Sequence, residues 1–441
     1  MSKNTDNKSI DKIYDKVILG GGWAGLLYAN KEKSNNKKIV IIEMSNENEL
    51  GGLLKSEVID GFTFDVGGPH LLFSRNQDYL SFIVSLLGEN VSKRSRNNYV
   101  FYNNQLIPYP FENGIYKLKP EKRVKFITNI IEKMIYLAKN KDYRPNNFLE
   151  WIINFFGETM ANEYLIPYNE KIWKRDLDKI SADWVFMPGR LPFPDVKKLI
   201  ESAAGIPNVG YEEQAFFYYP KEGGIQSLYN SIFNLVNNKG VNFIFGEKVN
   251  NIELINNIYL INNNIKAKKV VNTIPLPEIL IALDEDKKLA DQFDYNSVVI
   301  VGIALNKPTP NQTTVYIPDK KIIFHRYTWM SSLIPPKEKE KSNIIAEITI
   351  PKNQEFYLNQ IEKEVINGLL KLNIIDDEKE IIFTKSWFNK YGYPIYTLNH
   401  NEIRGRAMEI LNNYGIKSVG RWGSWHYWNT DMVYKAVYEI D

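Results

Sequence analysis

Apolar and polar residues follow one another in patterns that predict both strands and helices. A short apolar run at 17–19 leads into a glycine cluster, an apolar stretch follows at 24–29, and a second apolar run covers 39–42. The two short runs predict strands, and the stretch between them predicts a helix. We therefore expect the chain to begin with a βαβ unit of an α/β fold.

In later regions of the chain the apolar positions recur with other spacings. Residues 120–205 carry apolar positions at helical spacing, as in RVKFITNIIEKMIYLAKN, and predict a mainly helical region. Residues 295–350 and 380–398 alternate apolar and polar positions and predict the strands of a sheet. The Pro-rich breaks at 188–195 and 335–336 predict loops.

Composition excludes several classes of function. A length of 441 residues exceeds what one core usually supports, so two or three lobes are expected. Lys and Arg outnumber Asp and Glu by only 55 to 52, which gives no basic field strong enough to indicate nucleic-acid binding. The absence of cysteine excludes disulfides, iron–sulfur clusters, thiolate zinc sites and cysteine nucleophiles. The four histidines stand singly, so no metal site is expected.

The first fifteen residues, MSKNTDNKSIDKIYD, are polar and charged and lack the apolar segment of a secretory signal. No uncharged apolar run reaches the length of about 18 residues that a membrane span needs. A cytoplasmic protein without a membrane span is therefore expected.

The glycine cluster has the spacing of a dinucleotide-binding turn. Gly20 allows the tight turn, Gly22 lets the backbone approach a pyrophosphate, and Gly25 lets the helix pack on the strand. The helix N-terminus stabilises the phosphates. Glu43 ends the second strand, where an acidic residue binds the ribose hydroxyls. Together these features predict a dinucleotide site.

Two further glycine pairs favour FAD over NAD. Gly51-Gly52 and Gly67-Gly68 follow within 25 residues of Glu43. They imply more backbone packed against a long ligand than a nicotinamide dinucleotide needs. Each pair by itself is also compatible with an ordinary turn.

With these motifs the sequence resembles the UDP-galactopyranose mutase-like branch of the flavin amine-oxidase-like superfamily, whose members are FAD-dependent and include protoporphyrinogen-oxidase-like proteins. The resemblance covers nearly the whole chain. Its segments are 67–73 (GGPHLLF), 105–111 (QLIPYPF), 156–158 (FGE), 168–175 (YNEKIWKR), 189–192 (GRLP), 219–224 (YPKEGG), 324–326 (FHR) and 420–432 (GRWGSWHYWNTDM).

The resemblance implies an α/β fold in which a Rossmann-type (GR2-like) FAD-binding domain, discontinuous in sequence, is combined with a helical lobe and an antiparallel-sheet substrate domain. The FAD-binding domain would comprise residues 11–95, 222–280 and 405–441. Residues 96–221 would form the mainly helical lobe and residues 281–404 the sheet lobe.

Site residues are carried over from the matching motifs. His70 would lie against the flavin, Arg326 and Arg190 would hold the substrate diphosphate, and Trp173 would line the sugar-nucleotide cleft. The residues expected to bind the cofactor are Gly20, Gly22, Trp23, Ala24, Gly25, Glu43, Gly51, Gly52, Leu53, Gly67, Gly68, Val249, Arg421, Trp428 and Met432.

Each of the proposed catalytic residues has an alternative interpretation. His70 also suits a structural histidine, Arg326 and Arg190 a salt bridge, and Trp173 a helix-packing core. His325, His400 and the run 337–341 are interpreted as surface.

The chain also departs from the mutases. Phe73 stands where a second histidine is expected, Trp425 and Trp428 where tyrosines contact the diphosphate, and Asn429 in place of an acidic residue. A tryptophan N–H can donate to phosphate, but the pocket would have other hydrogen bonds. The identity of the sugar and of the base therefore stays open.

The resemblance implies an FAD-dependent mutase, an isomerase that acts on a nucleotide-linked sugar in surface polysaccharide or glycan biosynthesis. N5 of the reduced flavin would take part in a pyranose–furanose interconversion. The alternatives are an amine oxidase-like FAD-dependent oxidoreductase that oxidises a sugar, an amine or another small substrate, and a flavin-containing subunit without turnover. The oligomeric state stays open, with a homodimer among the possibilities.

Overall fold

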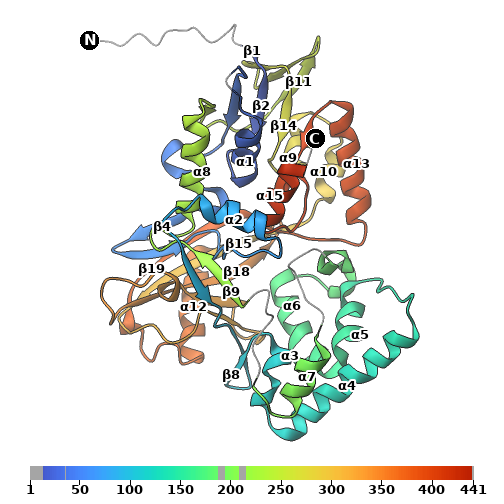
Figure 1. Ribbon diagram of the computed structural model, residues 1–441, viewed down its shortest axis with the longest axis vertical. Coiled ribbons are helices and arrows are strands. Elements are labelled where there is room, and N and C mark those ends of the chain that lie inside the picture. The colour runs from blue at the N-terminus through green and yellow to red at the C-terminus, as the bar shows by residue number, and fades with distance from the viewer. Residues whose placement is uncertain (1–12, 35, 187–193, 208–214, 440–441) are drawn as a thin grey trace. The chain divides into compact units, whose positions relative to one another are not determined.

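The computed structural model describes residues 13–34, 36–186, 194–207 and 215–439, and the chain divides into two compact units (Figure 1). The first unit comprises residues 1–54, 228–293 and 399–441, and the second comprises 55–227 and 294–398. Residues 55–95, expected in the FAD-binding domain, cluster with the second unit, and the helical and sheet regions share that unit. The division into an FAD-binding domain, a helical lobe and a substrate-binding sheet lobe stays a prediction.

A five-stranded sheet forms the centre of the first unit. Its order is β10-β3-β2-β14-β20, and every neighbouring pair is parallel. The strands are β2 (Lys16–Leu19), β3 (Ile39–Ile42), β10 (Asn242–Ile244), β14 (Val270–Asn272) and β20 (Lys417–Ser418). All residues of β3 and β14 are buried, as expected for a parallel sheet covered on both faces. The Rossmann-type α/β fold expected from the sequence is confirmed.

Helices surround this sheet. The first helix, α1, lies beside the last, α15 (Figure 1). The helices are α1 (Trp23–Glu32), α8 (Gln226–Asn238), α9 (Leu276–Ala282), α10 (Lys287–Gln292), α13 (His400–Asn413), α14 (Gly420–Gly423) and α15 (Thr430–Glu439). A second sheet has the order β1-β13-β12-β11, with strands β1 (Ile13–Tyr14), β11 (Ile252–Ile255), β12 (Ile258–Ile261) and β13 (Ile265–Ala267).

The second unit contains a seven-stranded sheet of order β19-β15-β18-β17-β16-β7-β8. Its pairs are antiparallel except for β16 with β7, which is parallel. The strands are β7 (Tyr99–Tyr102), β8 (Gln105–Pro108), β15 (Tyr295–Leu305), β16 (Thr314–Tyr316), β17 (Arg326–Trp329), β18 (Ser342–Pro351) and β19 (Ile381–Pro394). The unit also contains two antiparallel strand pairs, the hairpin of β4 (Ser56–Ile59) with β5 (Phe62–Asp65) and the long-range pair of β6 (Ser92–Ser95) with β9 (Phe216–Tyr219).

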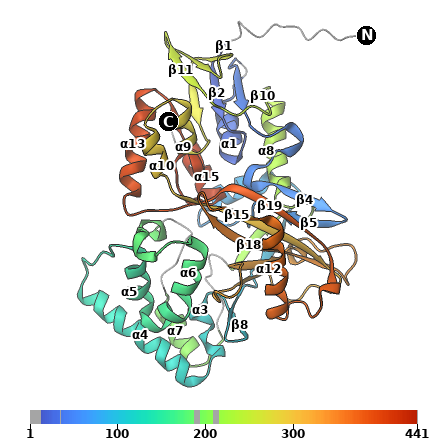
Figure 2. The same ribbon diagram turned by 180° about the vertical axis from the view of Figure 1, so that it is seen from behind.

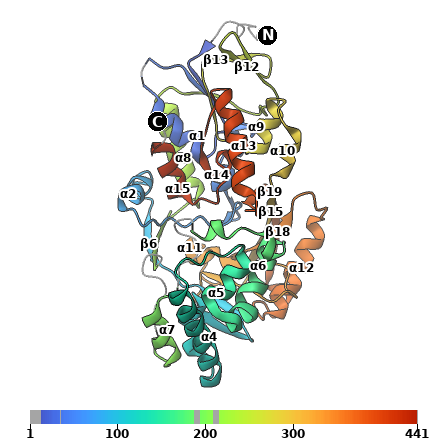
Figure 3. The same ribbon diagram turned by 90° about the vertical axis from the view of Figure 1, so that its right-hand side faces the viewer.

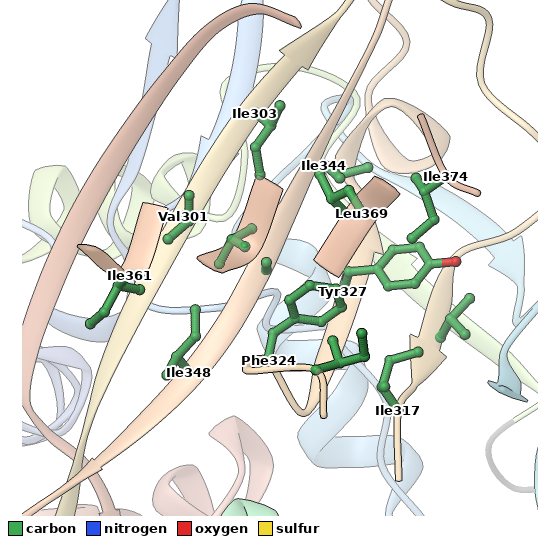
Figure 4. Packing of buried hydrophobic residues seen from close by; sticks show 14 of the residues in the cluster. Val301, Ile303, Ile317, Phe324, Tyr327, Ile344, Ile348, Ile361, Leu369 and Ile374 are labelled. Atoms are coloured by element: carbon green, nitrogen blue, oxygen red, sulfur yellow. The ribbon is translucent and has the colours of Figure 1, made fainter. Parts of the chain in front are cut away.

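One face of this large sheet is apolar and lies under α12 (Leu358–Lys371), as Figure 2 shows. Side chains of the helix, including Ile361 and Leu369, meet Phe324, Tyr327 and Ile348 in a buried cluster (Figure 4). Because side chains alternate along a strand, residues between the cluster positions point to the opposite face. That face therefore carries polar residues, which are Thr314, Tyr316, Arg326, Thr328, Asn343, Glu347 and Thr349.

Helices form the rest of the second unit (Figure 3). They are α3 (Phe111–Gly114), α4 (Pro120–Lys139), α5 (Phe148–Met160), α6 (Ile166–Trp173) and α7 (Val196–Ala203), with a π-helical turn at Ala161–Leu165 and the short α2 (Gln77–Ser85) and α11 (Met330–Leu333) elsewhere. The side-chain amide of Asn296, in β15, donates to the last carbonyl groups of α6, at Ile172 (3.0 Å) and Trp173 (2.7 Å). Asn296 thereby joins the helical region to the sheet. Within the described residues, no helix is long and apolar enough to cross a membrane.

Candidate functional site

The turn between β2 and α1 is built so that only glycine fits at two positions. Gly20 has φ +95°, a conformation that side chains rarely adopt. A Cβ added to Gly25 would lie 2.0 Å from the carbonyl oxygen of Gly20. The first turn of α1 therefore contacts the end of β2 directly.

Gly22 leaves the start of α1 open. It caps the helix with extended backbone and provides no side-chain cap, so no side chain of the cap occupies the first N–H groups of α1. A Cβ at Gly22 would meet nothing within 4 Å, and one at Gly52 would meet only the Cα of Gly22, at 3.9 Å. Two glycines thus line the open space at this helix N-terminus, which suits a pyrophosphate.

Glu43 is held beside this turn. It follows β3, and its Oε2 accepts the N–H of Gly21 at 2.7 Å while Oε1 accepts the N–H of Ser45 at 2.9 Å. Each carboxylate oxygen keeps a lone pair for a further donor. The side chain is thus fixed where the sequence predicts the ribose hydroxyls of a dinucleotide.

Other predicted cofactor residues lie in the C-terminal segment of this unit or against it. The indole of Trp23 donates to the carbonyl of Thr430, at the start of α15, at 3.1 Å. Arg421 donates from Nη1 to the carbonyl of Trp428 at 3.0 Å. A Cβ at Gly420 would lie 2.4 Å from the Cβ of Ala24, which shows how closely α14 approaches α1.

The remaining predicted cofactor residues differ in exposure. Val249 is buried, while Leu53 and Met432 are half-buried in the same unit. Gly51, the residue before Gly52, is buried and has a φ of +141°. Cofactor contact by these residues stays a prediction.

In the second unit, Arg326 and Glu347 form the centre of the polar sheet face. Arg326 donates from Nε and Nη2 to the two carboxylate oxygens of Glu347, at 2.6 and 2.7 Å. The hydroxyl of Tyr393 lies 3.3 Å from Glu347 and 3.4 Å from Arg326. The salt bridge expected as the alternative role of Arg326 is therefore present. The Arg326 side chain is still 24% exposed, so it can also contact a ligand.

The predicted glycine–histidine loop lies against this pair. A Cβ at Gly68, which has φ +89°, would lie 3.2 Å from Oε2 of Glu347. Gly67 and His70 are half-buried beside it in the chain. The loop that the sequence predicts to approach a flavin therefore approaches the buried carboxylate.

His325 is buried, so its interpretation as a surface residue is wrong. It is 1% exposed, and its ring lies 6.4 Å from the ring of Tyr168 and 6.5 Å from that of Tyr393. Burial, together with the charges of Arg326, Lys171 and Lys174, holds the pKa of His325 well below its ordinary value. The imidazole is therefore neutral and offers one donor and one acceptor.

His400 is also buried rather than on the surface. It is 3% exposed, and its ring lies 6.0 Å from that of His426 in the first unit. Neither histidine gave a local signal of burial, because the neighbouring rings come from segments distant in sequence: Tyr168 and Tyr393 for His325, and His426 for His400. Lys337 and Lys339 are exposed, as expected for the run 337–341.

Four tyrosines and an arginine extend the polar face, and the sequence predicted no role for any of them. The rings of Tyr109 and Tyr316 lie 4.7 Å apart, and Tyr168 contacts Tyr316 edge-on at 5.7 Å. Burial raises the pKa of Tyr109 and of Tyr168, which keeps their hydroxyls protonated as donors. These residues are Arg96, Tyr109, Tyr168, Tyr316 and Tyr393. Tyr109 and Tyr168 lie in the segments 105–111 and 168–175 that carry the family resemblance, whereas the other three lie in none of its segments.

Trp173 and Arg190 are the two remaining residues that the sequence predicts to contact a substrate. Trp173 is 2% exposed, its ring meets Trp184 at 4.9 Å, and its indole donates to Asn169 at 3.2 Å. The structure thus gives it the helix-packing role, and contact with a substrate stays a prediction. Arg190 lies outside the described residues.

A basic pocket of about 390 Å³ opens at the end of α6. Lys171, 6% exposed, donates there to the carbonyls of Ile317 (2.9 Å) and Asp319 (2.7 Å). Burial and then the charge of Lys174 lower the pKa of Lys171 to about 7. Among the residues that the structure describes, no group of three His, Asp or Glu side chains could hold a metal ion.

Comparisons with known proteins agree with this geometry. The profile of a NAD(P)-binding Rossmann-like domain matches residues 18–85. A dTDP-fucopyranose mutase of Escherichia coli is 25% identical over 249 residues, which cover 53% of this chain and 57% of that protein. A UDP-galactopyranose mutase of Mycoplasma genitalium is 28% identical over 167 residues, 36% of this chain and 40% of that protein. The chain thus aligns with little more than half, or less, of these relatives' lengths.

The crystal structure of a reduced UDP-galactopyranose mutase matches with a TM-score of 0.85 at 24% identity, covering 96% of this chain and 92% of that one. The chain thus resembles the UDP-galactopyranose mutase-like branch of the flavin amine-oxidase-like superfamily, in sequence over part of its length and in fold over nearly all of it. Amine oxidases of the same superfamily are among the further matches. The glycine turn of the first unit and the arginine–tyrosine face of the second are the two candidate ligand sites.

Proposed function

We propose that the protein is an FAD-dependent mutase that interconverts the pyranose and furanose forms of a nucleotide-linked sugar, with the flavin in its reduced form. The observation that carries the proposal is the pairing, in one chain, of a dinucleotide-binding turn with a half-buried face of arginine and tyrosine donors. Mutase relatives along the chain support it.

The residues of the first unit fit a dinucleotide. Gly22 and Gly52 leave open space at the N-terminus of α1, and a side chain at either position would fill it. Glu43 is oriented by two backbone N–H groups and can accept from ribose hydroxyls. Gly20, Gly22, Gly52 and Glu43 would therefore hold the FAD pyrophosphate and adenosine ribose.

The residues of the second unit suit an anionic sugar nucleotide. Arg326 offers the guanidinium donors that Glu347 does not engage. The hydroxyls of Tyr109 and Tyr168, whose pKa values are raised by burial, and the hydroxyl of Tyr316 offer further donors. Preorganised donors of this kind bind a diphosphate and stabilise it as a leaving group. Reduced flavin, when bound, supplies the nucleophile for the anomeric carbon, so the protein needs no nucleophilic side chain.

The sugar is proposed to differ from galactopyranose. Phe73, Trp425 and Trp428 stand where the mutases carry histidine and tyrosines, and a dTDP-fucopyranose mutase aligns with 53% of this chain. A deoxyhexose on a dTDP carrier is therefore a substrate to test alongside UDP- and GDP-hexoses.

The second candidate is an FAD-dependent oxidoreductase, because amine oxidases share the fold and match the chain. The test uses purified protein with oxidised and with dithionite-reduced flavin, against a panel of UDP-, GDP- and dTDP-hexoses. The mutase predicts isomerised product only with reduced flavin and without net redox change. Hydrogen peroxide formation, or bleaching of oxidised flavin by substrate, would contradict the mutase and support the oxidoreductase.

A further inference from the structure

Arg96 is a half-buried cation in the second unit, and its Nε and Nη2 atoms are buried. It follows β6, and its backbone N–H donates to the carbonyl of Ala215 at 2.8 Å. The next residue, Asn97, accepts the N–H of Thr313 at 2.8 Å, which fixes this segment at the start of β16. The guanidinium lies over the ring of Phe73, 4.7 Å from its centroid.

The guanidinium edge that recognises oxyanions has no acceptor in Arg96. In Arg326 the Nε and Nη2 groups bind the two oxygens of Glu347. In Arg96 the same two groups are buried, and no described residue accepts a hydrogen bond from them. Leaving such donors and their charge unpaired inside a protein is costly, so a structure that keeps them indicates a missing anionic partner.

Charge balance places that partner in the candidate substrate site. Tyr316 pairs in register with Arg326 across β16 and β17 and stacks near Tyr109. Burial lowers the pKa of Arg96; the charge of Arg326 lowers it further, and interactions with Tyr316 and Tyr109 raise it, so all four groups lie within electrostatic reach. Glu347 neutralises Arg326, whereas Arg96 carries a charge that no described carboxylate balances.

We propose that Arg96 is an anion-binding residue of this site and that its Nε–Nη2 edge binds a phosphoryl group of the substrate. The identification of that group as part of a nucleotide sugar rests on the proposed function. Phe73 supports the flat face of the guanidinium and leaves the edge for the phosphoryl oxygens. In this arrangement Arg326 and Glu347 form a pair without net charge. Arg96 therefore supplies the net attraction for the negative charge of the diphosphate.

The test compares wild type with Arg96→Gln, Arg96→Lys and the control Lys93→Gln. Lys93 is exposed three residues away, so its substitution removes the same charge outside the site. Binding of UDP, UMP, uridine and inorganic pyrophosphate to the holoprotein with oxidised flavin is measured by calorimetry at two salt concentrations. Thermal unfolding and the flavin spectrum report whether each variant is folded.

Arg96→Gln is expected to weaken UDP binding by about tenfold or more and uridine binding by less than about twofold, since only the phosphate contacts are lost. Arg96→Lys should restore part of the loss, because lysine keeps the charge without the fork. Lys93→Gln should bind UDP like wild type. Wild-type UDP affinity in folded Arg96→Gln, or equal losses for UDP and uridine, would overturn the proposal.

Binding of inorganic pyrophosphate distinguishes a failure of the Arg96 proposal from a failure of the proposed function. If wild type binds no nucleotide but binds pyrophosphate, and Arg96→Gln weakens that binding, the anion site stands and the nucleotide-sugar function fails. If wild type binds neither UDP nor pyrophosphate, the anion site itself is refuted.

Discussion

Arg326 and Glu347 form a two-point ion pair across neighbouring strands β17 and β18, with Nε–Oε1 and Nη2–Oε2 distances of 2.6 and 2.7 Å. Glu347 is 1% exposed, so its charge depends on this one arginine and on the hydroxyl of Tyr393. The pair therefore fixes the arginine in place and also makes the strand pair sensitive to the loss of either partner.

Substitution of Arg326 by Met is expected to destabilise the protein by about 3–5 kcal/mol, because the buried Glu347 carboxylate loses its counter-charge. The double variant Arg326→Met, Glu347→Leu should recover part of that loss, since no charge is left unpaired. Urea unfolding of the wild type, both single variants and the double variant measures the coupling. Strictly additive losses would show that the two residues do not depend on each other.

Two alanine substitutions in the glycine turn should have opposite effects. Gly25→Ala places a Cβ 2.0 Å from the carbonyl of Gly20 and should lower the melting temperature of the protein. Gly22→Ala places a Cβ in open space and should leave the apoprotein stable, but it should reduce bound flavin because the side chain fills the phosphate position. The ratio of flavin to protein absorbance and the melting temperature of the apoprotein measure the two effects. Full flavin content in Gly22→Ala would argue against the predicted pyrophosphate position.

Asn296 is expected to stabilise the end of α6. Asn296→Ala leaves the carbonyls of Ile172 and Trp173 without their donors inside the protein and should cost about 1–3 kcal/mol in the free energy of unfolding. Asn306→Ala, at the exposed position directly after β15, is the matched control and should change stability by less than about 0.5 kcal/mol. Equal effects in urea unfolding would show that the helix end does not rely on this amide.

The buried carboxyl group of Asp65 should make stability depend on pH. Asp65 accepts from Ser56 and Tyr219, each at 2.6 Å, yet burial raises its pKa to about 6. Because the native carboxyl group keeps a proton that the unfolded chain releases, the contribution to stability is complete below about pH 4. It falls by up to about 3 kcal/mol as pH rises to about 6, and then stays constant.

Asp65→Asn should remove this slope, which stability curves between pH 4 and 7 would detect. Asp60→Asn, at the exposed turn of the same hairpin, should keep the wild-type slope. An unchanged slope in Asp65→Asn would show that other groups cause the pH dependence.

The sequence by itself determined the Rossmann-type unit, the glycine turn and the position of Glu43. These features depend on neighbours in the chain: a turn that needs positive φ at Gly20 and close helix–strand contact at Gly25 constrains residues only a few positions apart. The helical region and the sheet were also predictable, because periodicity is a local property.

Only the tertiary structure decided the composition of the polar site in the second unit. Glu347 meets Arg326 because β17 and β18 pair, and Arg96 reaches the same site because the segment before β7 is bonded to the start of β16. His325 is buried by α6 and β19, which contribute Tyr168 and Tyr393 from distant parts of the chain. No local pattern encodes such contacts, because burial and charge pairing depend on which segments the fold brings together.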